Sequence, residues 1–94
     1  MSDLAAVQVV VYGRVKGVFF RVFTEKQAEM LGLSGYVRNL PSEEAVEVWA
    51  EGERDKLETL TSNLKAGPPT AKVTKVTTKW SAYTGRYAGF SIRY

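Results

Sequence analysis

The chain has 94 residues, 45% of them hydrophobic and 24% charged, which suits one globular domain spanning residues 1–94. Its net charge of +3 is compatible with an anionic ligand but is too small to indicate nucleic acid. The absence of histidine and cysteine excludes Ser-His-Asp and Cys-His catalysis, thiolate and phosphohistidine intermediates, and zinc sites built on these residues.

Other absences bear on location and metal binding. No apolar run approaches the ~18 residues of a membrane helix, and the N-terminal sequence lacks the features of a secretory signal. A chain without cysteine fits a reducing compartment. Asp3 and Asp55 are the two aspartates, so neither an aspartyl-phosphate enzyme nor a carboxylate-bound magnesium site is expected. We expect a cytoplasmic protein without membrane partner, metal or cofactor.

The first elements predicted along the chain are a strand and a helix. "AVQVVVYG" (6–13) is β-branched and apolar on both faces apart from Gln8, which is typical of a central, buried strand. Residues 20–31 change to helical periodicity, and Gly32 is a suitable end for that helix. The face predicted to point to the core consists of Phe20, Phe23, Gln27 and Leu31. Met30 is expected to lie beside this face.

The middle of the chain predicts two strands and a second helix. "SGYVRNL" (34–40) is a strand ended by Pro41, and a polar turn leads to "AVEVWAEG" (45–52). There, one face is expected to be buried and the face with Glu47, Trp49 and Glu51 to be wet. Residues 53–67 place three leucines on a helical stripe, Leu57, Leu60 and Leu64.

Two further strands complete the pattern. In "AKVTKVTTKW" (71–80), Val73 and Val76 are three residues apart, which indicates a bulge. "GFSIRY" (89–94) is a short fifth strand. The order βαββαβ(β), with right-handed crossovers, predicts an α+β ferredoxin-like sandwich, in which two helices pack on one face of an antiparallel sheet. This fold hosts enzymes, RNA binders and metal chaperones, so it does not define the function.

The stretch "YGRVKGVFFR" (12–21) joins the first strand to the first helix. Gly13 and Gly17 allow backbone N–H groups to converge, and the following helix N-terminus also favours an anion. Arg21 lies in the first turn, where a guanidinium can bind a phosphate through two hydrogen bonds. These features fit either an anion site or a structural turn that carries a surface arginine.

Two motifs resemble a known family. "GRVKGVFFR" is similar to the acylphosphatase pattern G-x-V-Q-G-V-x-F-R, and "GYVRN" (35–39) to its second block, G-[aromatic]-V-[basic]-N. "AGPP" and the closing "FSIRY" extend the resemblance to about residues 7–94. The resemblance implies a monomeric hydrolase that cleaves small-molecule acyl phosphates to a carboxylate and phosphate without a metal or cofactor.

The resemblance also implies the site residues. Arg21 would bind the phosphoryl group, and Asn39 would position the attacking water. The backbone of the loop between strand and helix would complete the phosphate site through Val15, Lys16, Gly17, Val18, Phe19 and Phe20.

The chain departs from the family pattern at two places. Lys16 stands where the family usually has glutamine, and its side chain is expected to face solvent, like that of Arg38. The turn "LPSEEA" after Asn39 is one residue longer than usual and lacks its glycine, which predicts an altered hairpin.

Two other functions fit the same fold. One is a non-catalytic module that binds anions or nucleic acid, although nucleic acid is not expected because "AVEVWAE" offers one aromatic and two glutamates rather than a stacking platform. The other is a domain detached from a larger enzyme, such as the carbamoyltransferase of hydrogenase maturation. A free-standing acylphosphatase is the preferred interpretation.

Overall fold

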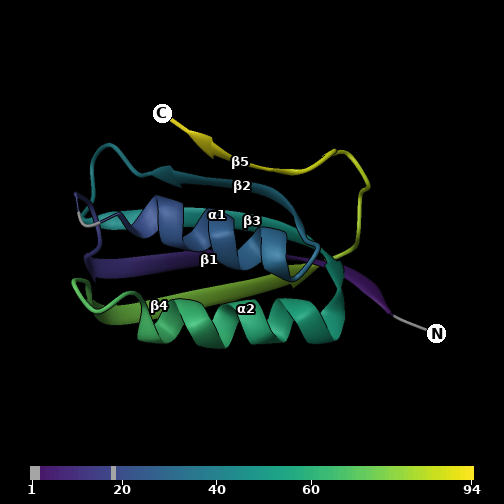
Figure 1. Cartoon of the computed structure of the whole chain (residues 1–94), viewed down its shortest axis with the longest axis horizontal. Helices are drawn as coiled ribbons and strands as arrows, with labels where there is room; N and C mark the ends of the chain where they lie inside the picture. Colours follow the sequence, from purple (N-terminus) through teal and green to yellow (C-terminus); the bar gives the residue numbers. More distant parts are fainter. Residues whose placement is uncertain (1–2, 18) are drawn as a thin grey trace.

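The computed structural model describes residues 3–17 and 19–94 as a five-stranded sheet with two helices on one face (Figure 1). The strands lie in the order β4-β1-β3-β2-β5. In chain order, the elements are β1 (Leu4–Arg14), α1 (Phe20–Met30), β2 (Ser34–Asn39), β3 (Ala45–Glu53), α2 (Arg54–Ala66), β4 (Lys72–Ser81) and β5 (Phe90–Arg93). This confirms the ferredoxin-like α+β fold, and β1 is internal to the sheet, as its valines predict.

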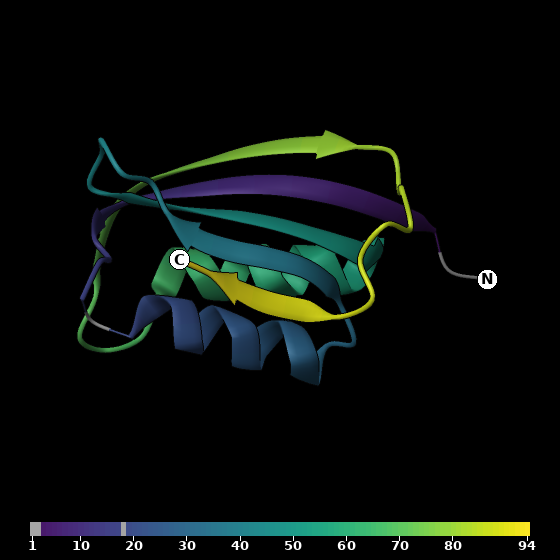
Figure 2. The same ribbon diagram turned by 90° about the horizontal axis from the view of Figure 1, so that it is seen from above.

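The core lies between the sheet and the two helices, as the view from above shows (Figure 2). Alternate valines of β1 face the helices, and the leucines of α2 are fully buried, as predicted from their spacing. The helix α1 buries Phe20, Thr24 and Ala28, whereas Phe23 is partly buried. The prediction of Met30 beside the apolar face was wrong, because this face is centred on Phe20, Thr24 and Ala28 and leaves Met30 81% exposed.

The fifth strand corrects the prediction of a purely antiparallel sheet. β5 pairs with β2 in parallel, whereas the other neighbouring strands are antiparallel. The reason is the path of residues 82–89, here called the strap, which passes round the end of the sheet from β4 to the opposite edge (Figure 2). Since β5 starts at the end where β4 finishes, it runs against β4 and therefore along β2.

The bulge predicted from Val73 and Val76 is present. The pairing of β1 with β4 shifts by one residue between Tyr12, opposite Lys75, and Gly13, opposite Val73. Gly13 is the residue that this close approach requires, because it has φ 125° and a Cβ there would overlap the Lys72 carbonyl.

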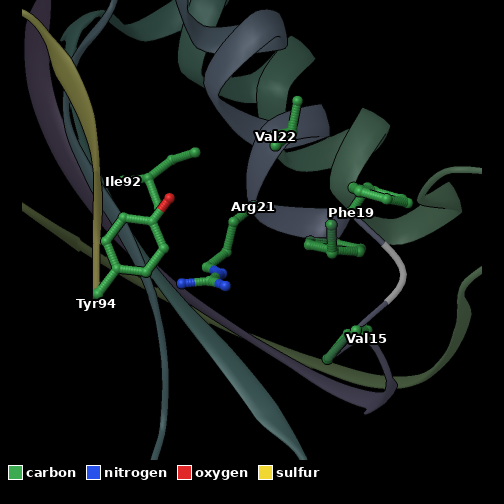
Figure 3. A pocket seen from close by; sticks show the side chains of 8 residues that line it. Val15, Phe19, Arg21, Val22, Ile92 and Tyr94 are labelled. Atoms are coloured by element: carbon green, nitrogen blue, oxygen red, sulfur yellow. The ribbon is translucent and has the colours of Figure 1, made fainter.

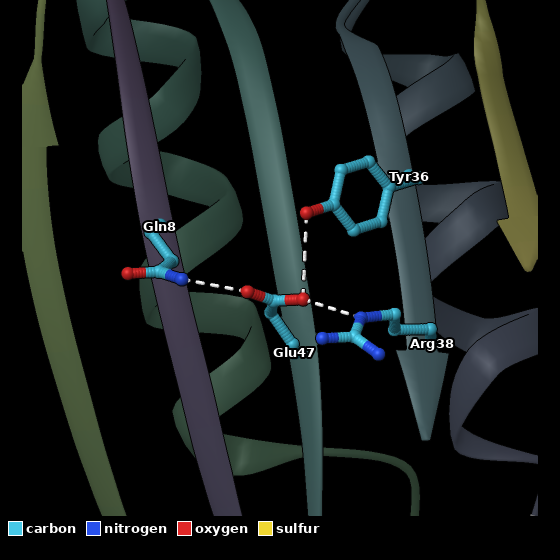
Figure 4. A network of polar contacts seen from close by, with 4 residues as sticks. All are labelled: Gln8, Tyr36, Arg38 and Glu47. Carbon is cyan, nitrogen blue, oxygen red and sulfur yellow. Dashed lines mark hydrogen bonds and ion pairs between the residues drawn. The ribbon is translucent and has the colours of Figure 1, made fainter. Parts of the chain in front are cut away.

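The prediction that Glu47 and Glu51 of β3 face solvent was wrong, because both side chains are buried. Glu47 accepts hydrogen bonds from Gln8 Nε2 at 2.6 Å and Arg38 Nε at 2.6 Å, so Arg38 is an ion-pair partner and not a simple solvated charge (Figure 4). Tyr36 also donates to it, at 3.4 Å. Burial raises the pKa of Glu47, but the bonds from Arg38 and Gln8 outweigh this effect and lower the pKa overall.

Glu51 ties the strap to the sheet. It accepts hydrogen bonds from Trp49 Nε1 at 2.8 Å, from the Thr84 hydroxyl at 2.6 Å and from the Thr84 and Gly85 amides at 3.1 and 2.9 Å. The strap is also bonded to β2, since the Gly35 amide donates to the Gly89 carbonyl at 2.9 Å. These bonds fix the segment that delivers β5 to the edge beside β2.

Within residues 3–17 and 19–94, no helix has the length and apolar character needed to cross a membrane.

Candidate active site

Among the described residues, no acceptor is bonded to the first backbone amides of the helix α1. Its N-cap residue is Phe19, which makes no side-chain capping bond, and no acidic residue lies in the first turn. The first backbone bond of the helix runs from the Phe23 amide to the Phe19 carbonyl at 3.0 Å, so the amides of Phe20, Arg21 and Val22 precede the helical bonding pattern. Such donors and the helix dipole favour an anion at this end.

The loop before the helix lies between β1 and α1. Gly17 has φ 70°, and a Cβ there would meet nothing within 4 Å, so the backbone at Gly17 is open to a ligand. The Val15 amide donates to the Gly13 carbonyl at 2.9 Å, so Val15 contributes a buried side chain while its amide is occupied within the loop. Val18, another residue predicted for the site, lies outside the described residues.

A hollow of about 180 Å³ opens at this place (Figure 3). It is lined by Val15, Gly17, Phe19, Phe20, Arg21, Val22, Ile92 and Tyr94. The structure thus brings five of the residues named from the sequence to one hollow. The three others that line it were missed, and two of these, Ile92 and Tyr94, come from β5 and the C-terminal residue, whose place depends on the parallel pairing with β2.

Arg21 points across this hollow between α1 and the end of β5 (Figure 3). Its guanidinium carbon lies 4.6 Å from the centroid of the Tyr94 ring, and Nη1 makes a long contact of 3.5 Å to the Arg93 carbonyl. The ion pairs among the described residues, Arg38–Glu47 and Arg54–Glu58, leave Arg21 without a carboxylate partner. Its positive charge is therefore available to an anion.

Asn39 is the last residue of β2 and does not line the hollow. It follows Arg38, which is paired with Arg93, so it lies one position beyond the last pair between β2 and β5. Its side-chain Oδ1 is buried without a hydrogen-bond partner, and no other side-chain atom of the described residues is in this state. A buried acceptor of this kind requires a donor that the protein does not supply.

Lys16 connects the loop to the same corner. Its Nζ donates to the Leu40 carbonyl at 2.5 Å, so the expectation of a solvent-facing side chain was wrong. The reason is the short distance between the loop and the end of β2, which lets the lysine reach a backbone carbonyl next to Asn39. The hairpin that follows is closed by a bond from the Leu40 amide to the Ala45 carbonyl at 3.0 Å.

Histidine, cysteine, aspartate and glutamate do not gather into a metal-binding group of three or more anywhere in residues 3–17 and 19–94. The donors at the hollow are nitrogen atoms, namely backbone amides and a guanidinium, and these suit an anion rather than a metal cation.

The fold is a ferredoxin-like sandwich, and its hollow combines a helix N-terminus, an open glycine and an arginine that has no carboxylate partner among the described residues. The acylphosphatase family model matches residues 7–92. The chain belongs to the acylphosphatase family, as the motifs "GRVKGVFFR" and "GYVRN" predict.

Relatives and solved structures agree with this assignment. The chain is 49% identical to an acylphosphatase of Dehalococcoides mccartyi over 85 residues, which are 90% of this chain and 93% of the relative. It is similar to the structure of an acylphosphatase from Coxiella burnetii, with a TM-score of 0.90, 41% identity and coverage of 97% and 94% of the two chains. It also resembles 12% of full-length HypF, with 26% identity and a TM-score of 0.87. The chain is an enzyme of the acylphosphatase class, a hydrolase of acyl phosphates.

Proposed function

We propose that the enzyme hydrolyses acyl phosphates by direct attack of one water molecule on phosphorus, without a metal or a covalent intermediate. The water oxygen forms a new bond to phosphorus, and the bond between phosphorus and the acyl oxygen breaks. Its electron pair leaves with the carboxylate, and the proton of the water passes to the phosphate or to solvent. The substrate is a small molecule, and every residue invoked belongs to one chain, so a monomer suffices.

The phosphoryl group is held by Arg21 and by backbone donors among Lys16, Gly17, Phe19 and Phe20, whereas Val18 lies outside the described residues. The single observation that carries this proposal is the position of the Arg21 guanidinium, which has no carboxylate partner among the described residues, beside the N-terminus of α1 at the hollow. In a loose transition state, negative charge spreads over the equatorial oxygens, and preorganised donors stabilise it at no cost of reorganisation.

Asn39 positions the water in this proposal. The support is its buried Oδ1, which has no partner in the described part of the chain and can accept a hydrogen bond from a water hydrogen. The hydrogen bond from Lys16 to the Leu40 carbonyl holds the loop beside Asn39. The attacking water and the phosphoryl group are thereby kept at a fixed distance from each other.

The chemistry needs neither a general acid nor a strong base. A carboxylate leaving group has a pKa near ~4, so it departs as an anion at neutral pH. The chain has no histidine or cysteine to serve as a proton donor or nucleophile. A phosphate monoester with a poor alkoxide leaving group is therefore expected to be a poor substrate.

The test is hydrolysis of benzoyl phosphate in the presence of EDTA, compared with an alkyl phosphate such as glycerol 3-phosphate under the same conditions. We expect undiminished turnover of benzoyl phosphate with EDTA and negligible turnover of the ester. Loss of activity on chelation would refute the metal-free mechanism, and comparable rates on both substrates would refute the argument that no general acid is needed because the carboxylate leaves readily. The cytoplasmic location stays a prediction from the sequence.

A further inference from the structure

Arg38 directly precedes Asn39 in the motif "GYVRN" but takes no part in the proposed reaction. Its Nε donates to the carboxylate of Glu47 at 2.6 Å, and the two residues lie opposite each other in the pairing of β2 with β3 (Figure 4). Successive side chains of a strand point to opposite faces, and Val37 packs in the core between sheet and helices. The ion pair therefore lies on the open face of the sheet, one residue away from Asn39.

The carboxylate of Glu47 is held from both neighbouring strands. Glu47 is 7% exposed, and it accepts hydrogen bonds from Gln8 of β1 and from Tyr36 and Arg38 of β2 (Figure 4). Burial of a charge is costly, and a buried ion pair is often no more stabilising than apolar residues of the same volume. Stability alone therefore does not account for a carboxylate at this place. The bonds do fix β2 against β3 and β1 at the residue before Asn39.

Asn39 lies where β2 is supported on one side only. It is paired with Val46 of β3, whereas the last pair between β2 and β5 is Arg38 with Arg93. The end of a strand with few partners opens locally more readily than its middle. Arg38 is the last position of β2 that is held from both sides, so its ion pair limits the movement of the residue that follows.

We propose that Glu47 is a positioning residue for the reaction: through Arg38 it fixes the end of β2 and thereby orients the Asn39 side chain toward the attacking water. This inference rests on the proposed function, in which Asn39 places that water. A displacement of about 1 Å in a reacting group can lower a rate 10²-fold, so a loosened strand end should lower kcat. Phosphate binding depends on Arg21 and the loop amides, so it should persist.

The experiment uses three variants, Glu47→Met, Glu47→Gln and Arg38→Met, at a temperature where each is folded by circular dichroism. It measures kcat for benzoyl phosphate and the inhibition constant of inorganic phosphate. Methionine is similar to glutamate in shape but its sulfur is only a weak acceptor. We expect Glu47→Met and Arg38→Met to lower kcat about tenfold and to leave the inhibition constant within about twofold of the wild type. Glu47→Gln keeps an oxygen for Arg38 and should retain more turnover.

Two controls separate positioning from stability. Glu51 is a second buried carboxylate of β3, but it is paired with Ser34 at the start of β2. Glu51→Gln should therefore leave the kcat of the folded protein within about twofold of the wild type, although it lowers stability. In the Asn39→Ala background, adding Glu47→Met should change kcat by less than about twofold, because Glu47 acts through Asn39. Loss of stability alone would not depend on Asn39.

Three results would overturn the positioning role. The first is a wild-type kcat, or a parallel rise of the inhibition constant, in folded Glu47→Met and Arg38→Met. The second is an equal loss of kcat from Glu47→Met with and without Asn39. The third is that none of the three variants folds, which would assign the ion pair to the stability of the sheet. All three leave the proposed function intact, whereas a wild-type kcat in Asn39→Ala would refute the proposed function itself.

Discussion

Replacing Glu51 by glutamine should destabilise the protein strongly although no side chain changes size. The carboxylate is fully buried and accepts four hydrogen bonds, from Trp49, from Gly85 and twice from Thr84. Hydrogen bonds to a charged group contribute about 1.5–3 kcal/mol each. Glutamine offers one oxygen for two of these bonds and turns an NH₂ group toward the remaining donors.

The expected loss follows from this geometry. Two lost bonds amount to roughly 3–6 kcal/mol, partly offset because a charge is no longer buried, which leaves about 2–4 kcal/mol. For a domain of this size, 1 kcal/mol shifts Tm by about 4–8 °C, so thermal unfolding should occur about 10–30 °C earlier. The control is Glu43→Gln, at an exposed position in the turn before β3. A Tm for Glu51→Gln within about 4 °C of the wild type would refute the anchoring role.

The same interaction has a defined pH dependence. Burial raises the pKa of Glu51, but the hydrogen bonds from Thr84, Trp49 and the strap amides outweigh this effect, so the pKa is lowered overall. A carboxyl whose folded-state pKa lies below the unfolded value of ~4.3 stabilises the fold above that pH, and the contribution is lost as the pH falls through the folded-state pKa. The difference in Tm between wild type and Glu51→Gln should therefore shrink below about pH 4. An equal difference at pH 7 and pH 3 would contradict this.

The remaining predictions concern the site and the sheet. Arg21→Gln should raise the inhibition constant of inorganic phosphate by about 100-fold or more, since two charge-assisted hydrogen bonds are lost, and Arg54→Gln is the matched removal of a charge elsewhere. Lys16→Met should lower kcat about tenfold because the hydrogen bond to the Leu40 carbonyl is lost. Lys16→Gln keeps a donor for this carbonyl and should retain more turnover. Equal losses of kcat in the two variants would show that this hydrogen bond does not support catalysis. Gly35→Ala should lower the free energy of unfolding, measured by urea titration, by about 3 kcal/mol or more, because Gly35 has φ 138° and a Cβ there would overlap the Trp49 carbonyl. An unchanged free energy of unfolding would disprove this.

Local patterns predicted most of the fold. The valines of β1, the leucine stripe of α2 and the spacing of Val73 and Val76 gave the internal strand, the second helix and the bulge. Each of these signals depends on neighbours within a few residues. The two motifs likewise gave the family, because their residues are contiguous in sequence.

The features that were missed depend on partners far apart in sequence. The buried state of Glu51 depends on donors from the strap more than 30 residues later, and the contact of Lys16 depends on a carbonyl 24 residues away. Charged residues in an alternating strand normally indicate a solvated face, so the pattern of β3 could not reveal their burial. Likewise, the roles of Ile92 and Tyr94 at the hollow depend on the parallel pairing of β5, which no local pattern indicates.

The most direct test of the mechanism is a paired measurement on Asn39→Ala: kcat for benzoyl phosphate and the inhibition constant of inorganic phosphate. If Asn39 positions the water while Arg21 and the loop amides hold the phosphoryl group, kcat should fall about 10²-fold and the inhibition constant should stay within about twofold of the wild type. Retention of more than about a tenth of the wild-type kcat, or a parallel loss of phosphate binding, would contradict this division of roles.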